Sequence, residues 1–103
     1  MKKLWEILVP NFAKDGTKYA LDHHHKWDEK VKEIAGGITI LKPAKGIWIS
    51  PVGKLFREEM IPVRIYCTEE DIESIIAFTL TYYDQEVVMA YEVSNNVKIR
   101  SKS

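Results

Sequence analysis

The residues of this sequence best suited to chemistry are basic and aromatic side chains that alternate between positions 42 and 66. A cationic side chain beside an aromatic ring can hold a nucleobase by stacking and its phosphates by charge-assisted hydrogen bonds. The same pattern also suits a solvated hairpin whose tryptophan belongs to the core, so both interpretations stay open. The residues of this segment that we predict to bind a ligand are Trp48, Lys54, Arg57, Glu58, Arg64 and Tyr66.

An Asp-Gly pair marks the segment after the first apolar run as a turn. This turn would lie at the end of the first strand, so we expect its polar side chains to complete the pocket. We expect Arg57 to bind a phosphate, and Glu58 or Glu59 to accept a hydrogen bond from a sugar hydroxyl or a base. The predicted ligand is therefore an anionic small molecule, most simply a nucleotide derivative. The members that the first loop would add are Asn11, Lys14 and Asp15.

Histidines occupy positions 23, 24 and 25, which raises the question of a metal site. Zinc ligands on one helix stand a turn apart, whereas neighbouring residues point about 100° away from each other. The chain also lacks Cys-x-x-Cys, His-Glu-x-x-His and paired His-x-Ser/Thr spacings. We therefore predict no metal site, no cofactor, and a structural or surface role for these histidines. A histidine acting as a general base is the alternative, because its ordinary pKa is close to neutral pH.

The composition is that of a folded domain without a dominant charge. The 103 residues are 46% hydrophobic and 29% charged, which suits one domain over residues 1–103. The 15 Lys and Arg residues balance the 15 Asp and Glu residues, so no overall field would attract nucleic acid or a membrane surface. We therefore expect neither nucleic acid nor a membrane among the partners.

Two features favour a cytoplasmic location. Glu6 and Pro10 interrupt the apolar run near the start, which leaves no signal-peptide core, and no other segment approaches the roughly 18 apolar residues of a membrane span. Cys67 is the single cysteine, so it cannot form an internal disulfide. Its apolar strand pattern predicts a buried thiol and not a reactive one.

Hydrophobic periodicity predicts strands and helices in the order β-α-β-β-α-β. Helices are expected at residues 21–35 and 68–83, and the glycine pair at positions 36 and 37 suits a left-handed stop for the first. Pro62 interrupts a long extended run and predicts a bulge, a bend or a strand start. The expected strands cover residues 4–9, 37–41, 47–49, 54–67 and 87–93, with turns at 43–46 and 50–53 and an additional edge strand at 97–99.

This order predicts an α+β ferredoxin-like fold, in which an antiparallel sheet carries both helices on one face. The other face of the sheet would then be bare. Because a bare apolar face is commonly covered by an identical subunit or used by a ligand, we expect a homodimer or a higher homo-oligomer.

A set of glycine, aromatic and polar positions spans nearly the whole chain. It consists of Asn11, Gly16, Gly36-Gly37-x-Thr39, Gly46-x-Trp48, Gly53, Glu58 or Glu59, and Gln85. This ensemble resembles a widespread family of small uncharacterised bacterial and phage proteins with a ferredoxin-like domain. The resemblance implies that fold, a phage or prophage origin, and polar positions around one end of the sheet, without an established activity. Small phage proteins of this size include oligomeric sponges that sequester nucleotide immune signals.

Three functions fit these features. The favoured one is a non-catalytic homo-oligomer that binds an anionic nucleotide-derived molecule at a subunit boundary, for example as a phage-type sponge. The second is a cofactor-independent enzyme on a dimeric ferredoxin-like fold, a nucleotide hydrolase or a monooxygenase, with a histidine as base. The third is a protein-interaction module whose bare sheet face docks another protein.

Overall fold

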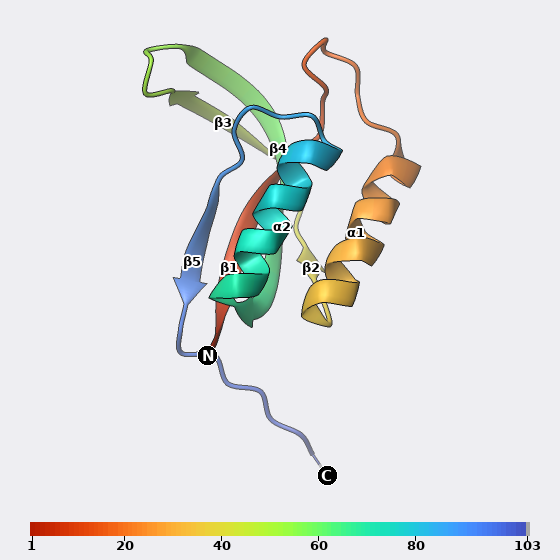
Figure 1. The fold of residues 1–103 in the computed structure, drawn as a ribbon, viewed down its shortest axis with the longest axis vertical. Coiled ribbons are helices and arrows are strands. Elements are labelled where there is room, and N and C mark those ends of the chain that lie inside the picture. The colour runs from red at the N-terminus through yellow and green to blue at the C-terminus, as the bar shows by residue number, and fades with distance from the viewer. Residues whose placement is uncertain (103) are drawn as a thin grey trace.

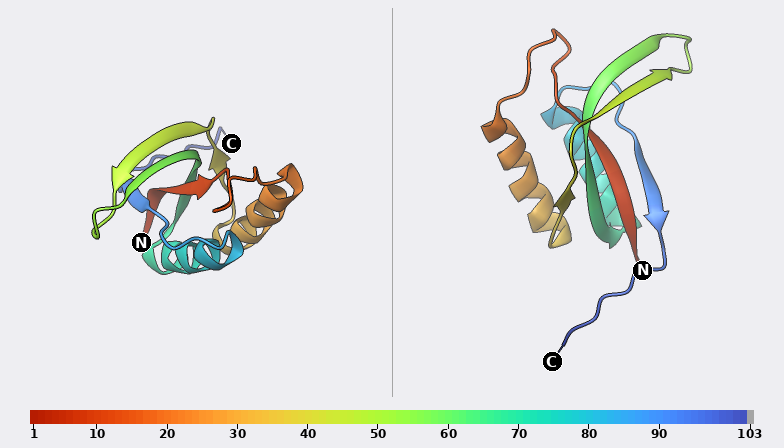
Figure 2. Two further views of the ribbon diagram at one scale, coloured as in Figure 1. Left: turned by 90° about the horizontal axis from the view of Figure 1, so that it is seen from above. Right: turned by 180° about the vertical axis from the view of Figure 1, so that it is seen from behind.

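The computed structural model describes residues 1–102 and shows an antiparallel sheet with two helices on one of its faces (Figure 1, Figure 2). The predicted α+β ferredoxin-like fold and the placement of both helices on one face are thus confirmed. The elements are β1 (Lys2–Pro10), α1 (Leu21–Ala35), β2 (Thr39–Ile40), β3 (Ala44–Ile49), β4 (Leu55–Thr68), α2 (Glu69–Tyr82) and β5 (Ala90–Ser94).

The sheet is organised around its longest strand, β4. The strands pair in the order β2-β4-β1-β5, and β3 pairs with β4 as well. Met60 of β4 faces both Pro10 of β1 and Ala44 of β3, so β3 lies on the edge of β4 opposite to β1, the edge that β2 also uses. The strand β1 is therefore central, as its compact apolar run predicts.

The core lies between the sheet and the helices. Successive side chains of a strand point to opposite faces, so Ile7 of β1 and Ile65 of β4 both turn toward the helices and are fully buried. The helices add Trp27 from α1 and Ile75 from α2. The buried hydrophobic residues are Ile7, Val9, Trp27, Val31, Val63, Ile65, Cys67, Ile72, Ile75 and Tyr83.

Local signals set the ends of both helices. Gly36 follows α1 with a φ of 89°, and its N–H donates to the carbonyl of Lys32 at 2.7 Å. Glycine adopts this left-handed conformation without a Cβ penalty. At the start of α2, Thr68 Oγ1 accepts a hydrogen bond from the backbone N–H of Asp71 at 3.1 Å, which satisfies one of the free donors of the first turn. Both boundaries agree with the sequence pattern.

The turn predicted at residues 43–46 is wrong, because β3 begins at Ala44. Ile40 pairs with Val63 and Ala44 with Met60, so residues 41–43 lie opposite residues 61 and 62. Three residues therefore lie opposite two, and the extra residue makes a bulge between β2 and β3 along one edge of β4. The irregularity expected at Pro62 therefore falls on its partner, and β4 runs through Pro62 without a break.

The additional edge strand predicted at residues 97–99 does not form. The last strand, β5, ends at Ser94, whose side-chain oxygen accepts a hydrogen bond from the backbone N–H of Asn96 at 2.9 Å. This local bond turns the chain away from the sheet, and the described tail leads past the N-terminus (Figure 1).

The sheet face opposite the helices carries a polar cluster at its centre. Glu6 is only 7% exposed, and its carboxylate accepts hydrogen bonds from Arg64 Nε at 2.9 Å and from the Tyr91 hydroxyl. Burial alone would raise the pKa of Glu6, but these two hydrogen bonds and the positive charge of Arg64 outweigh it and lower that pKa below its ordinary 4.5.

The lowered pKa of Glu6 predicts a loss of stability in acid. A carboxylate with a depressed native pKa stabilises the fold above its unfolded pKa, and this contribution disappears as the pH falls through the native value. We expect the urea midpoint to decline below about pH 4.5, and to decline less in Glu6→Gln. Urea unfolding at several pH values measures both. Parallel pH profiles of the two proteins would contradict this assignment.

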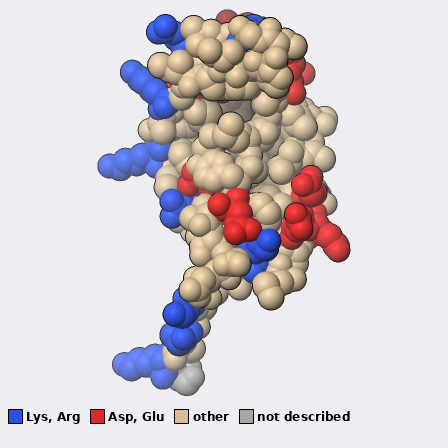
Figure 3. All heavy atoms as spheres, turned by 90° about the vertical axis from the view of Figure 1, so that its left-hand side faces the viewer, with Lys and Arg blue, Asp and Glu red and all other residues tan. Residues whose placement is uncertain are grey.

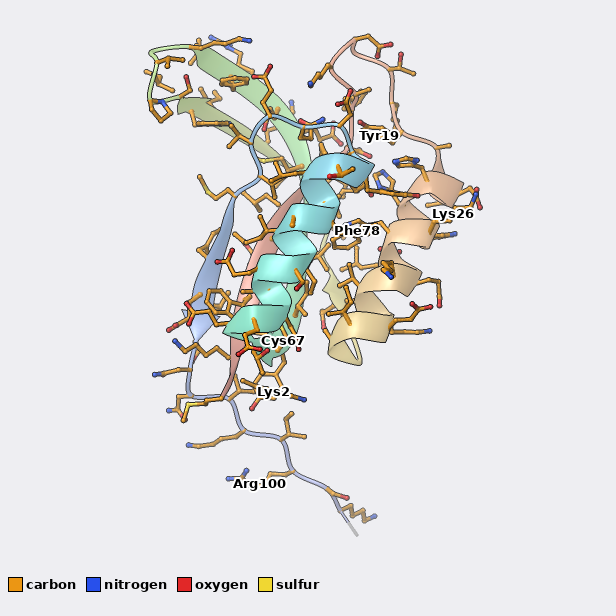
Figure 4. The ribbon with its side chains drawn as sticks, in the orientation of Figure 1. Lys2, Tyr19, Lys26, Cys67, Phe78 and Arg100 are labelled. Atoms are coloured by element: carbon orange, nitrogen blue, oxygen red, sulfur yellow. The ribbon has the colours of Figure 1, made fainter. Side chains whose placement is uncertain are left out.

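Cys67 lies on the helix-facing side of β4, close to the start of α2 (Figure 4). The side chain is fully buried, and burial raises the pKa of its thiol from 9.0 to about 11. Because only the thiolate reacts with alkylating agents, we expect iodoacetamide at pH 8 to modify the native protein at least about 100-fold more slowly than the unfolded chain. Equal rates in buffer and in urea, measured by mass spectrometry, would contradict the buried thiol.

Candidate functional site

A cleft forms at one end of the sheet because β4 is longer than its neighbour β1. The two strands pair from Met60 to Thr68 of β4, so residues 55–59 run past the end of β1. These residues pair with β3 and form a hairpin that projects away from the helices (Figure 1). The cleft lies between this hairpin, the loop after β1 and residues 85–87, and has a volume of about 430 Å³.

Aromatic rings of the hairpin form one wall of the cleft. Trp48 of β3 faces Phe56 of β4 in the strand register, and their rings stack with centroids 4.7 Å apart and an angle of 14° between planes. The ammonium group of Lys54 lies 5.0 Å from the centre of the Phe56 ring. A cation, a phenyl ring and an indole ring thus follow one another, an arrangement that suits a planar ligand with a negative group.

The charges around the cleft have both signs. Arg57 is exposed and, within residues 1–102, takes part in no ion pair, so its guanidinium can offer two parallel hydrogen bonds to a carboxylate or phosphate. Lys14 approaches Asp84 at 3.8 Å, but both side chains are largely exposed, and such a pair contributes little stability. The charged residues that line the cleft are Lys14, Lys54, Arg57, Glu58, Glu59 and Glu86.

A second, apolar hollow of about 220 Å³ adjoins the cleft. Trp48 borders both spaces, as do Glu58 and Gln85, and the apolar side is formed by residues such as Leu8 and Met89. Figure 3 shows the projecting hairpin at the top of this face, with a largely uncharged hollow below it. The combined space offers a polar part and an apolar part, and Trp48 lines both of them.

The structure brings together most of the predicted site residues. Asn11 lies behind the wall of the cleft, where its side-chain amide donates to Glu59 Oε1 at 3.1 Å. Asp15 sits in the loop between two lining residues, and its carboxylate accepts the backbone N–H of Thr17 at 2.9 Å, a hydrogen bond that lowers its pKa. The predicted residues that line the cleft directly are Lys14, Trp48, Lys54, Arg57 and Glu58.

Arg64 and Tyr66 do not join the cleft, contrary to the sequence-based prediction. Because β4 continues straight through Pro62, Arg64 lies roughly 20 Å along the strand from Glu58, at about 3.3 Å per residue. Its guanidinium pairs with Glu6 in the middle of the sheet. Tyr66 lies further along the same face, with the Lys2 ammonium 5.8 Å from the centre of its ring.

Several residues of the cleft were not predicted from the sequence. Phe56 extends the aromatic wall, and Gln85 and Glu86 reach the cleft because the chain turns back after α2. Gln85 belongs to the set of positions on which the sequence-based resemblance rests, which is the one signal that pointed to it. Phe56 stands between Lys54 and Arg57 in the sequence, so the pattern of interleaved basic and aromatic residues would have included it.

No family model matches this chain, and no curated protein matches it. Several solved structures match it at low sequence identity. The divalent cation tolerance protein CutA1 from Thermus thermophilus superposes with a TM-score of 0.70 and 11% identity, over 96% of this chain and 88% of that one. The periplasmic divalent cation tolerance protein CutA from Archaeoglobus fulgidus superposes with a TM-score of 0.68 and 12% identity, over 97% of this chain and 89% of that one.

A phage SAM lyase, solved in complex with S-methyl-5′-thioadenosine, is similar to the same extent. Its TM-score is 0.65 and its identity 15%, over 90% of this chain and 89% of that one. At such identities these likenesses show the shared ferredoxin-like fold. They do not by themselves place this chain in one of the families.

In the part of the chain that the structure describes, no group of three or more His, Cys, Asp or Glu residues is arranged to hold a metal ion. Neither α1 nor α2 is long and apolar enough to cross a membrane.

Proposed function

We propose that this protein is a homo-oligomer that binds, without transforming it, a nucleoside derivative with an anionic group. The observation that carries the proposal is the position of Trp48, which borders both a polar and an apolar space and lies on the same hairpin as Arg57. The indole would stack on the base, and Arg57 would bind the anionic group. Glu58 would accept a hydrogen bond from a sugar hydroxyl or from the base.

Exposed apolar side chains support the oligomer. Ile47, Ile49 and Leu55 share one side of the hairpin and are 69%, 68% and 51% exposed. Met89 precedes β5 and is 49% exposed, and Tyr91 on β5 is 41% exposed. Large apolar patches on a small protein are usually contact surfaces, and closed symmetric assemblies of one chain are their commonest use. The three hairpin residues lie on the face opposite to Trp48 and Phe56, so a neighbouring subunit on them would cover the back of the cleft wall.

The biological role that we propose is sequestration of a nucleotide-derived signal by a phage-type sponge in the cytoplasm. The pattern shared with bacterial and phage proteins supports a phage connection, and the likeness to a phage protein that binds a nucleoside agrees with it. Sequestration requires a binding site and a high protein concentration, and it requires no nucleophile or metal.

A second candidate is a lyase that splits S-adenosylmethionine: the substrate's own carboxylate attacks Cγ of its amino-acid part, the Cγ–S bond breaks with its electron pair going to sulfur, and the products are S-methyl-5′-thioadenosine and homoserine lactone. Two observations favour it: the fold shared with a phage SAM lyase, and the carboxylates of Glu58 and Glu59 beside aromatic rings in the cleft. Carboxylates and aromatic faces both attract a sulfonium cation. Catalysis would be lost in Glu58→Gln or Glu59→Gln, whereas binding without catalysis would weaken by no more than the one hydrogen bond that the carboxylate accepts.

Calorimetry with AMP, S-adenosylmethionine and S-methyl-5′-thioadenosine, followed by chromatography of the mixtures, tests both candidates. Binding of an unchanged nucleoside supports sequestration. Arg57→Ala is expected to lose affinity for an anionic probe. Lys30→Ala is the matched control, because Lys30 is an exposed cation on α1. Turnover of S-adenosylmethionine would establish the lyase. Absence of binding by all three compounds would contradict both candidates.

A further inference from the structure

The cleft carboxylate Glu59 is connected to the helices by a continuous chain of hydrogen bonds. Asn11 Nδ2 donates to Glu59 Oε1 at 3.1 Å, and His24 Nε2 lies 3.2 Å from Asn11 Oδ1. His24 Nδ1 in turn lies 2.6 Å from the hydroxyl oxygen of Tyr83, which follows α2. Figure 4 labels Tyr19, whose ring packs edge-on against Tyr83 at the end of the helices where this chain passes.

The direction of each bond follows from its neighbours. A carboxylate only accepts hydrogen bonds, so Asn11 presents its nitrogen to Glu59 and its oxygen to His24. The amide oxygen also only accepts, so His24 carries its hydrogen on Nε2. In the neutral ring Nδ1 is then an acceptor, and the Tyr83 hydroxyl donates to it. The hydrogen bonds therefore run in one direction from Tyr83 to Glu59.

Burial holds both ring systems in this protonation state. Tyr83 is fully buried, and burial raises the pKa of its hydroxyl, which keeps its hydrogen. Burial, followed by the neighbouring positive charges, lowers the pKa of His24. A proton on Nδ1 would take away the acceptor of the Tyr83 hydroxyl, which belongs to a fully buried side chain. The other ionisable groups around His24 are His23, His25, Lys18 and Tyr19.

Asn11 is fixed by its backbone as well as by its side chain. Its N–H donates to the Glu59 carbonyl at 3.2 Å, and its own carbonyl accepts the Tyr19 N–H at 3.0 Å. The residue is 5% exposed. Every polar group of Asn11 is therefore engaged, and its side chain cannot turn without breaking bonds to other segments.

We infer that Asn11, His24 and Tyr83 are positioning residues, which hold the Glu59 carboxylate on the cleft wall in the orientation that a ligand meets. The effect of this positioning on ligand binding rests on the proposed function. The chain of hydrogen bonds from Tyr83 to Glu59 is a property of the ligand-free protein. The two parts can therefore fail separately.

The first test uses NMR on the protein without ligand. In His24→Gln the new amide can accept from Tyr83 and donate to Asn11, so the chain is kept, whereas His24→Leu breaks it. We expect the Asn11 side-chain hydrogens to exchange at least about fivefold faster in His24→Leu, and at the wild-type rate in His24→Gln and in the control His25→Gln. His25 is the exposed neighbour on α1. Unchanged exchange in His24→Leu, or equal effects of Leu and Gln, would overturn the inference.

The reciprocal variant keeps the test decisive even where His24→Leu fails to fold. Glu59→Ala removes the far end of the chain from the half-buried cleft wall. We expect it to shift the imidazole ¹⁵N signals of His24, with which Glu59 has no direct contact, and Glu58→Ala to leave them in place. Unmoved His24 signals in Glu59→Ala would overturn the inference.

The second test measures AMP affinity. Loss of one hydrogen bond in the chain predicts about 2- to 10-fold weaker binding in His24→Leu, with His24→Gln and His25→Gln within about twofold of wild type. Moved NMR signals without any nucleoside binding would contradict the proposed function and leave the positioning role standing. Wild-type affinity of a folded His24→Leu would overturn the effect on the ligand.

Discussion

Replacing Trp48 with alanine is expected to weaken nucleoside binding about 10- to 100-fold. Alanine substitution of an aromatic residue that stacks on a base costs about 1–3 kcal/mol, and each 1.4 kcal/mol is about tenfold in the dissociation constant. Trp48 borders both hollows of the site, so its loss affects each half of a bound ligand. Calorimetry with AMP, S-adenosylmethionine and S-methyl-5′-thioadenosine measures the change.

Two controls separate stacking from damage to the hairpin. Trp48→Phe keeps an aromatic face opposite Phe56, and it should retain most of the affinity. Trp5→Phe changes a tryptophan that donates its indole hydrogen to the Cys67 carbonyl at 3.2 Å, away from the cleft, and it should bind like the wild type. Full affinity in Trp48→Ala would contradict the assignment of the indole as the base platform.

Replacing Trp27 with alanine is expected to lower the free energy of unfolding by about 3–5 kcal/mol, the usual cost of removing a buried tryptophan. Trp27 is 1% exposed and touches the core cluster between the helices. Its indole donates to Thr79 Oγ1 at 2.9 Å, and Thr79 in turn donates to the Ile75 carbonyl at 2.6 Å. The loss is a large part of the roughly 5–15 kcal/mol that stabilises a domain.

Urea unfolding followed by far-ultraviolet circular dichroism measures this loss. Trp27→Phe keeps most of the apolar volume but not the hydrogen bond, so we expect it to lose about 1–2 kcal/mol. A loss below about 1 kcal/mol in Trp27→Ala would show that the helices repack around the missing ring.

The fold was predictable because its determinants are local. Periodicity identified both helices, and the glycine after α1 and Thr68 before α2 marked their ends. The bulge between β2 and β3 was not predictable, because Pro43 and Gly46 carry turn signals while pairing with β4 decides the outcome. Only the register shows that one extra residue is accommodated opposite Pro62.

The candidate site was predictable only in part, because it depends on where strands end in space. The alternation of basic and aromatic residues identified Trp48, Lys54 and Arg57, which share one short hairpin. The same alternation included Arg64, which the structure places away from the cleft. Nothing in the sequence shows that Glu6 lies beside it on the neighbouring strand. The link from Asn11 to His24 joins a strand end to a helix and likewise has no sequence signal.

Native mass spectrometry of the purified protein, followed by denaturation and mass analysis of the released molecules, tests the central claim most directly. We predict a homo-oligomer that carries an intact nucleoside derivative, or that takes up one of the three probe nucleosides with one site per subunit. A monomer that releases nothing and binds none of the probes would contradict both the oligomer and the ligand site beneath the hairpin.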